Sequence, residues 1–140
     1  MNVEGRIEQY KNIMEPTTSE GFFNHINKLV KLGFFTAPAS TKYHGAYEGG
    51  LFDHSFITAK TLVELTERLE LKWERPESPY IVGIFHDLCK CDNYISHAFD
   101  KTYSYNPNII IPGHGDKSVI TGMLMFPSNT LSNTIGQNKA

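Results

Sequence analysis

Hydrophobic positions along the chain of 140 residues recur mostly at intervals of three and four, which is the spacing of amphipathic helices. This pattern predicts a short helix over residues 3–14 and a long one over residues 51–71. Between them, Thr17 and Glu20 are spaced as a capping box that begins another helix, and Gly33 is placed to end it. The sequence therefore favours an all-α fold.

The second half of the chain adds two helices and one ambiguous stretch. The helical period continues over residues 78–91 and returns over residues 116–126, where Pro127 would stop it. In between, two β-prone runs flank an Asn-Pro-Asn turn, so the stretch near 101–111 could form a small β-hairpin. We expect a single helical domain over residues 1–126, followed by an irregular polar tail over 127–140.

Residues 34–50 contain a proline and three glycines and are predicted to form an aromatic-rich loop. Such loops often line functional sites.

Composition narrows the class of partner. The formal net charge is -2 and the basic residues are scattered, which argues against duplex DNA or an anionic membrane surface as a partner, although a small anionic ligand stays open. No apolar run approaches the roughly 18 residues of a membrane span, so we expect a soluble, cytoplasmic protein with no membrane partner. Cys89 and Cys91 lack the second pair of a structural zinc site and are interpreted as reduced thiols.

The stretch GIFHDLCK, residues 83–90, places His86 and Asp87 inside an apolar helical run. Consecutive helical residues point about 100° apart, so the two side chains are not expected to pair directly, but both can reach one point over the helix groove. A metal ion is such a point, and imidazole with carboxylate suits a borderline divalent ion. Gly83, one turn earlier, would leave room for a ligand. The simpler alternative is a hydrogen-bonded histidine beside an ordinary surface acid.

Two further histidines strengthen the metal interpretation, since His54 borders the apolar stripe of the preceding helix and His114 lies just before the next one. The order His54, then His86-Asp87, then His114 resembles the HD-domain superfamily of metal-dependent phosphohydrolases, over roughly residues 40–120. The segment YHGAYEGGLFDHS, residues 43–55, is similar to the one before the first metal-binding histidine in the branch of bacterial 3'-5' exoribonucleases and related phage proteins.

The resemblance implies an HD-like helical bundle in which His54, His86 and Asp87 are metal ligands and Asp87 takes part in catalysis. It implies that His114 helps to hold a second ion where one is bound. Lys90 matches a lysine that lies near the substrate phosphate, a catalytic and substrate-binding role that suits its point charge. A solvated helix lysine is the alternative for Lys90.

The expected cofactor is a divalent transition metal, Mn, Fe, Ni, Co or Zn, with one ion favoured over two. Such an ion polarises a phosphoryl oxygen and activates water, which implies hydrolysis of a phosphate ester of a nucleotide or short single-stranded nucleic acid. His44, Tyr43 and Tyr47 could contact phosphate or stack a base, as substrate-binding residues, or could be packed loop side chains.

HD phosphohydrolases normally complete their metal site with an Asp from a later helix. This chain departs from that pattern, because no acid and no histidine follows Asp116. The chain could be a C-terminally truncated relative with an incomplete site. Alternatively, three protein ligands and a water molecule could suffice to hold the metal, or Asp116 could take the place of the missing Asp ligand. A missing anionic ligand would leave the site more positive and more retentive of phosphate. A catalytically silent nucleotide-binding or interaction module, and a homo-oligomer that completes the site in trans, also stay open.

Overall fold

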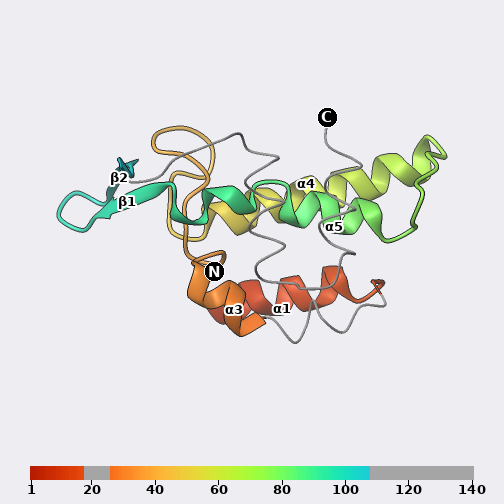
Figure 1. The fold of residues 1–140 in the computed structure, drawn as a ribbon, viewed down its shortest axis with the longest axis horizontal. Coiled ribbons are helices and arrows are strands. Elements are labelled where there is room, and N and C mark those ends of the chain that lie inside the picture. Colours follow the sequence, from red (N-terminus) through yellow and green to blue (C-terminus); the bar gives the residue numbers. More distant parts are fainter. Residues whose placement is uncertain (18–25, 108–140) are drawn as a thin grey trace.

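The structure of the protein is a computed structural model that describes residues 1–17 and 26–107. Its elements in chain order are the helices α1 (Val3–Met14), α3 (Ile26–Leu32), α4 (Gly50–Arg68) and α5 (Ser78–Phe85), the 3-10 helix η1 (Leu88–Asp92), and the strands β1 (Tyr94–His97) and β2 (Thr102–Tyr105). Helices α4 and α5 lie side by side, α1 and α3 form a layer below them, and the β-hairpin projects at one end (Figure 1). The expected helix-rich fold with one small hairpin is confirmed.

Several predictions fall outside the described residues. These are the last helix over 116–126, the polar tail over 127–140, the domain boundary at 126 and the part of the capping box that follows Thr17. Within residues 1–17 and 26–107, no helix combines the length and the apolar character needed to cross a membrane.

Helix α1 matches its predicted range, and the Asn2 side chain caps its start by accepting a hydrogen bond of 2.9 Å from the Gly5 amide. Helix α3 ends as predicted at Gly33, which has a φ of 93°. The Phe34 amide donates to the Leu29 carbonyl at 3.0 Å in the usual glycine-terminated pattern, and both side chains are fully buried. Gly33 therefore turns the chain directly into the core.

Aromatic rings dominate that core. Phe35 packs against Tyr10 of α1 at a centroid distance of 5.8 Å and against Phe52 of α4 at 5.2 Å. Phe34 stacks on Phe85 of α5 at 6.0 Å. Residues 34–49 thus form the expected loop, and residue 50 already belongs to α4, but the first two aromatic side chains of the loop belong to the core and do not line a site.

Helices α4 and α5 approach each other closely at Ala59 and Gly83. A Cβ atom at Gly83 would lie 2.6 Å from the Ala59 Cβ atom, closer than real carbon atoms allow. The prediction that Gly83 leaves room for a ligand is therefore wrong, because Gly83 is buried against α4. Its missing side chain serves helix packing instead.

The helix predicted over residues 78–91 consists of two pieces. Helix α5 ends at Phe85, His86 is its C-cap, and Asp87 leaves the helical region with φ -108° and ψ 19° before η1 begins. The apolar period continues across this break because Phe85 and Leu88 are both buried. The sequence pattern therefore could not reveal it.

The β-hairpin is present, but its turn lies earlier than the Asn-Pro-Asn segment. Strands β1 and β2 are antiparallel, with Tyr94 opposite Tyr105 and His97 opposite Thr102, so residues 98–101 form the turn. The Asn106 amide donates to the Asn93 carbonyl at 2.8 Å and closes the base of the hairpin. The stretch after Pro107 lies outside the described residues.

We expect Gly83→Ala to destabilise the protein by about 1–3 kcal/mol, the usual range for overpacking a core, although alanine normally stabilises a helix relative to glycine. Gly5→Ala in α1 is the matched control, because its Cβ atom would meet the side chain of Met1, which is 72% exposed and can turn away, and would lie 3.3 Å from the Asn2 Oδ1 atom. Urea unfolding of both variants checks this. Equal stability of the two variants would contradict the close packing of α4 on α5.

Candidate metal centre

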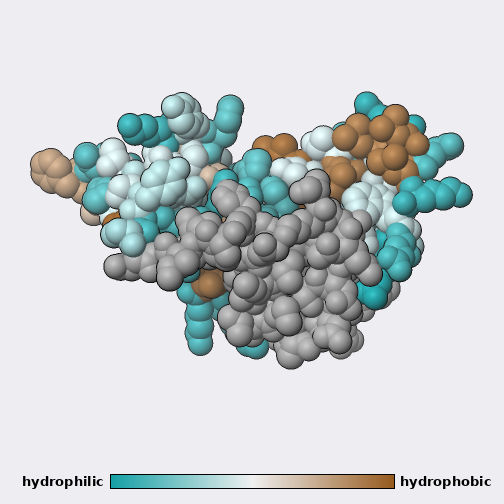
Figure 2. All heavy atoms as spheres, turned by 45° about the horizontal axis from the view of Figure 1, so that its top comes forward, coloured by the Kyte–Doolittle hydropathy of each residue, from teal (hydrophilic) through white to brown (hydrophobic). Residues whose placement is uncertain are grey.

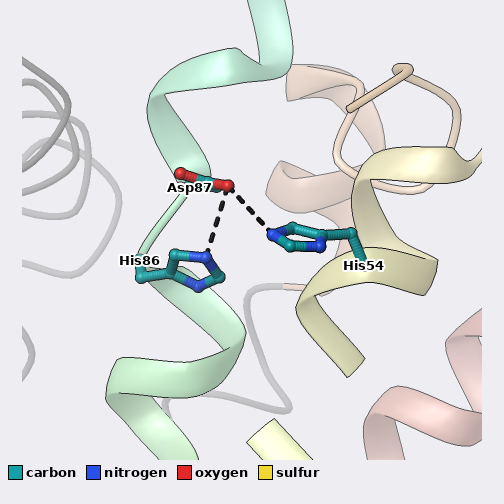
Figure 3. A group of neighbouring side chains, drawn as sticks. All are labelled: His54, His86 and Asp87. Atoms are coloured by element: carbon teal, nitrogen blue, oxygen red, sulfur yellow. Dashed lines mark ion pairs between the residues drawn. The ribbon is translucent and has the colours of Figure 1, made fainter. Parts of the chain in front are cut away.

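Three side chains from two neighbouring helices converge at one end of the α4 and α5 pair (Figure 3). His54 comes from the second turn of α4, His86 from the end of α5, and Asp87 from the break that follows. One ligand atom from each lies within 4.8 Å of the others. The Asp87 Oδ2 atom is 3.4 Å from His54 Nε2 and 3.3 Å from His86 Nε2. The structure thus brings together three of the four predicted metal ligands.

The backbone orients the His86 ring. Its Nδ1 atom is 2.8 Å from the Gly83 carbonyl oxygen, which can only accept a hydrogen bond, so Nδ1 carries the proton. In the neutral ring the lone pair then resides on Nε2, the atom that faces Asp87. A histidine that ligates metal usually donates its other ring N–H in this way.

The helix break places the Asp87 carboxylate beside the His86 ring. On a continuous helix the two side chains would diverge, as the sequence predicted, but Asp87 has a non-helical φ of -108°, and its Oδ2 atom lies 3.3 Å from His86 Nε2. The Asp87 side chain is 11% exposed, whereas that of His54 is 42% exposed. The centre is therefore buried on the Asp87 side and open to solvent on the His54 side.

Lys90 extends the cluster from η1. Its Nζ atom is 3.5 Å from Asp87 Oδ2 and donates to the Ala39 carbonyl at 3.1 Å. The Tyr94 hydroxyl donates to the same carbonyl at 3.2 Å. The Lys90 side chain is 18% exposed, so the interpretation of Lys90 as a solvated helix lysine is not supported. The lysine is held next to the carboxylate, where it can reach an anion bound at the centre.

The pKa shifts follow from burial and from these contacts. Burial alone would raise the pKa of Asp87, but hydrogen bonding to His86 and the nearby positive charges lower it well below its usual range. Burial tends to lower the pKa of His86, yet its contacts with Asp87 outweigh burial and raise it. For His54 burial prevails and the pKa falls. The carboxylate is thus ionised at neutral pH.

A pocket of about 380 Å³ opens beside His54. Its lining includes His44, Tyr47, Asp53 and Ile57, and it is more apolar than polar in character. The structure therefore places two of the three loop residues predicted to contact substrate, His44 and Tyr47, in one cavity with a candidate metal ligand. Tyr43 is 82% exposed and lies outside this lining.

Asp53 immediately precedes His54 but is committed elsewhere. The Arg6 guanidinium of α1 binds both Asp53 carboxylate oxygens, at 2.9 and 3.0 Å. The Tyr47 hydroxyl donates to Asp53 at 2.8 Å, and this hydrogen bond raises the Tyr47 pKa. Arg6 therefore anchors the first turn of α4 and the wall of the pocket. This network was missed from the sequence, because Arg6 and Asp53 lie 47 positions apart and nothing in their local patterns connects them.

The donor set fits a divalent transition ion. Two imidazole nitrogens and one carboxylate oxygen are typical ligands for Mn, Fe, Co, Ni or Zn, and three protein ligands with an open side suit a catalytic site. The fourth predicted ligand, His114, lies outside the described residues.

No protein-family model, curated protein or solved structure matches the chain.

We expect the protein, purified without chelator and reconstituted with Mn²⁺ or Ni²⁺, to hold near-stoichiometric metal, and His86→Ala to lose it. His97→Ala is the matched control, because His97 lies in β1, away from the cluster. Its Nε2 atom is hydrogen-bonded to the Ser104 hydroxyl at 2.7 Å. Elemental analysis per chain checks this. Equal metal content in all three proteins would contradict a site at His86.

Metal affinity should rise with pH. The pKa of His86 is raised above its ordinary value of 6.5. At pH values near and below this raised pKa, a proton therefore competes with the metal for the His86 Nε2 atom. Below the His86 pKa we expect affinity to fall about tenfold per pH unit, with about one proton released on binding, and above it affinity should level off. Calorimetric titration in two buffers of different ionisation enthalpy, from pH 6 to 8, checks both. Constant affinity without proton release would contradict ligation by His86.

Proposed function

We propose that the protein is a metal-dependent phosphohydrolase of the HD type that acts on a phosphate ester of a nucleotide or short single-stranded nucleic acid. The observation that carries the proposal is the convergence of the His54, His86 and Asp87 ligand atoms within 4.8 Å. The chain order of these ligands, with a histidine in one helix and a His-Asp pair after the next, supports the HD assignment. A helix-rich fold is consistent with it.

Each described residue has a defined task in this reaction. His54, His86 and Asp87 would hold a divalent ion, which supplies Lewis acidity toward a phosphoryl oxygen and lowers the pKa of water. The Gly83 carbonyl fixes the His86 tautomer, so that in the neutral ring Nε2 carries the lone pair that would ligate the ion. Lys90 provides a fixed positive charge for a non-bridging phosphate oxygen, since its ammonium group is held 3.5 Å from Asp87 Oδ2. No protein nucleophile is required.

The pocket beside His54 would hold the organic part of the substrate. An aromatic wall at Tyr47 suits stacking of a base, and His44 can donate to a phosphate or sugar oxygen. Tyr47 does not have to reorganise on binding, because Asp53 already holds its hydroxyl and Arg6 holds Asp53. A preformed wall of this kind reduces the entropy lost on binding.

The alternative is a catalytically silent module that keeps the nucleotide pocket and performs no hydrolysis. One observation favours it, namely that Asp87 Oδ2 already has the Lys90 ammonium at 3.5 Å and His86 at 3.3 Å. The raised pKa of His86 lets it be protonated near neutral pH, so the carboxylate can be charge-balanced without a metal.

With added Mn²⁺ or Ni²⁺, we expect hydrolysis of bis(p-nitrophenyl) phosphate or p-nitrophenyl phosphate, and a loss of about 100-fold or more in kcat/KM for Asp87→Asn. Removing even an outer partner of a metal ligand reduces activity by about 10–100-fold, so loss of the carboxylate charge should do at least as much. Steady-state rates with and without chelator measure this effect.

Lys90→Gln tests the phosphate contact separately. We expect this variant to retain the metal and to show a raised KM, because it loses a charge near the phosphate but no ligand. Lys72→Gln is the matched control, since Lys72 is exposed in the connection between α4 and α5 at the other end of the helix pair (Figure 1). Absence of metal-dependent hydrolysis, together with nucleotide binding that survives His86→Ala, would favour the silent module.

A further inference from the structure

A second pocket adjoins the one beside His54. It has a volume of about 360 Å³, and its lining includes Tyr47, Glu48, Ser96, Lys101 and Tyr103. Tyr47 lines both pockets and therefore stands between them. One wall of the second pocket comes from the loop that precedes α4 and the other from the β-hairpin, so the second pocket extends from Tyr47 toward the hairpin.

The hairpin wall has a defined face and is held in place. Ser96 of β1 lies directly opposite Tyr103 of β2, and cross-strand partners project to the same side of a sheet. Tyr94 lies two residues before Ser96, on the same face, and its hydroxyl is bound to the Ala39 carbonyl at 3.2 Å. The hairpin is thus tied to the loop on the side that carries the pocket.

The groups in this second pocket match a nucleobase better than a phosphate. The half-buried Tyr103 ring offers a stacking surface, and the Ser96 hydroxyl can donate or accept a hydrogen bond. The Glu48 carboxylate would repel a phosphate but accepts hydrogen bonds from an amino group on a base edge. Lys101, exposed at the hairpin turn with a φ of 57°, can pair with a phosphate at the rim.

We infer that this second pocket binds the base of the nucleotide adjacent to the one at the metal centre. The ligand class is a single-stranded oligonucleotide of at least two nucleotides, with a preference for a base that carries an exocyclic amino group. This inference rests on the proposed function, because it extends the substrate of the same site. In Figure 2 the surface at the hairpin end is mostly hydrophilic or intermediate apart from its apolar tip, whereas a larger group of apolar side chains lies at the opposite end of the molecule.

The test is fluorescence anisotropy with labelled tetraadenylate, tetrauridylate and adenosine monophosphate, in chelator, so that binding is measured without hydrolysis. We expect the wild-type protein to bind tetraadenylate at least about tenfold more tightly than the mononucleotide, which is the effect of one additional stacked base. Lys101→Gln should lower this ratio severalfold. Lys72→Gln, which removes the same charge far from the hairpin, should leave the ratio unchanged.

Glu48→Ala tests whether the second pocket recognises the base itself. Removal of the carboxylate should abolish the preference for tetraadenylate over tetrauridylate, because uracil has no exocyclic amino group. Equal affinity of the wild-type protein for tetranucleotide and mononucleotide, or an unchanged ratio in Lys101→Gln, would overturn the second subsite. Metal-dependent hydrolysis is read out separately, so oligonucleotide binding without hydrolysis would refute the proposed reaction and leave this subsite standing.

Discussion

The close contact between Ala59 of α4 and Gly83 of α5 is the constraint on which the candidate site depends. His54 lies five residues before Ala59, and His86 lies three residues after Gly83, so antiparallel packing at this contact carries both histidines to the same end of the helix pair. A larger side chain at Gly83 would separate the two backbones, and the ligand atoms would separate with them. Because packed interiors resist such changes, the distance between the imidazoles is set by helix packing more than by any bond between the ligands.

The loop between α3 and α4 joins the aromatic core to the polar site. Phe34 and Phe35 anchor its start among rings from α1, α4 and α5. A few residues later the Ala39 carbonyl receives hydrogen bonds from Lys90 and Tyr94. The position of the lysine ammonium is therefore tied, through a short stretch of backbone, to the packing of the core. The same carbonyl holds the hairpin, so the two walls of the second pocket share one support.

Sequence patterns predicted the helices well where local signals agreed, and less well where the backbone departed from regular geometry. Helix α1 and the stop at Gly33 were predictable because hydrophobic period, cap and glycine coincide. The break at Asp87 was not, because burial continues on both sides of it. The three side chains that converge could be picked out from residue types and order, but the orientation of His86 depends on the Gly83 carbonyl and that of Lys90 on the Ala39 carbonyl. Backbone carbonyls occur at every position and leave no mark in the sequence.

Charge balance explains why the described centre suits an anion. The Asp87 carboxylate and the Lys90 ammonium cancel, and two neutral imidazoles add nothing, so a bound divalent ion would leave a net double positive charge. Asp53 cannot offset this charge although it precedes His54, because both of its oxygens are already bound to Arg6 and its charge is matched there. With a divalent ion bound, the field at the open side of the centre would therefore be positive and would attract a phosphate. Glu48, which lines the second pocket but not the pocket beside His54, makes that neighbouring position unfavourable for phosphate and favourable for a base. The second pocket thus differs in electrostatic character from the open side of the metal centre, as a chain of alternating phosphates and bases requires.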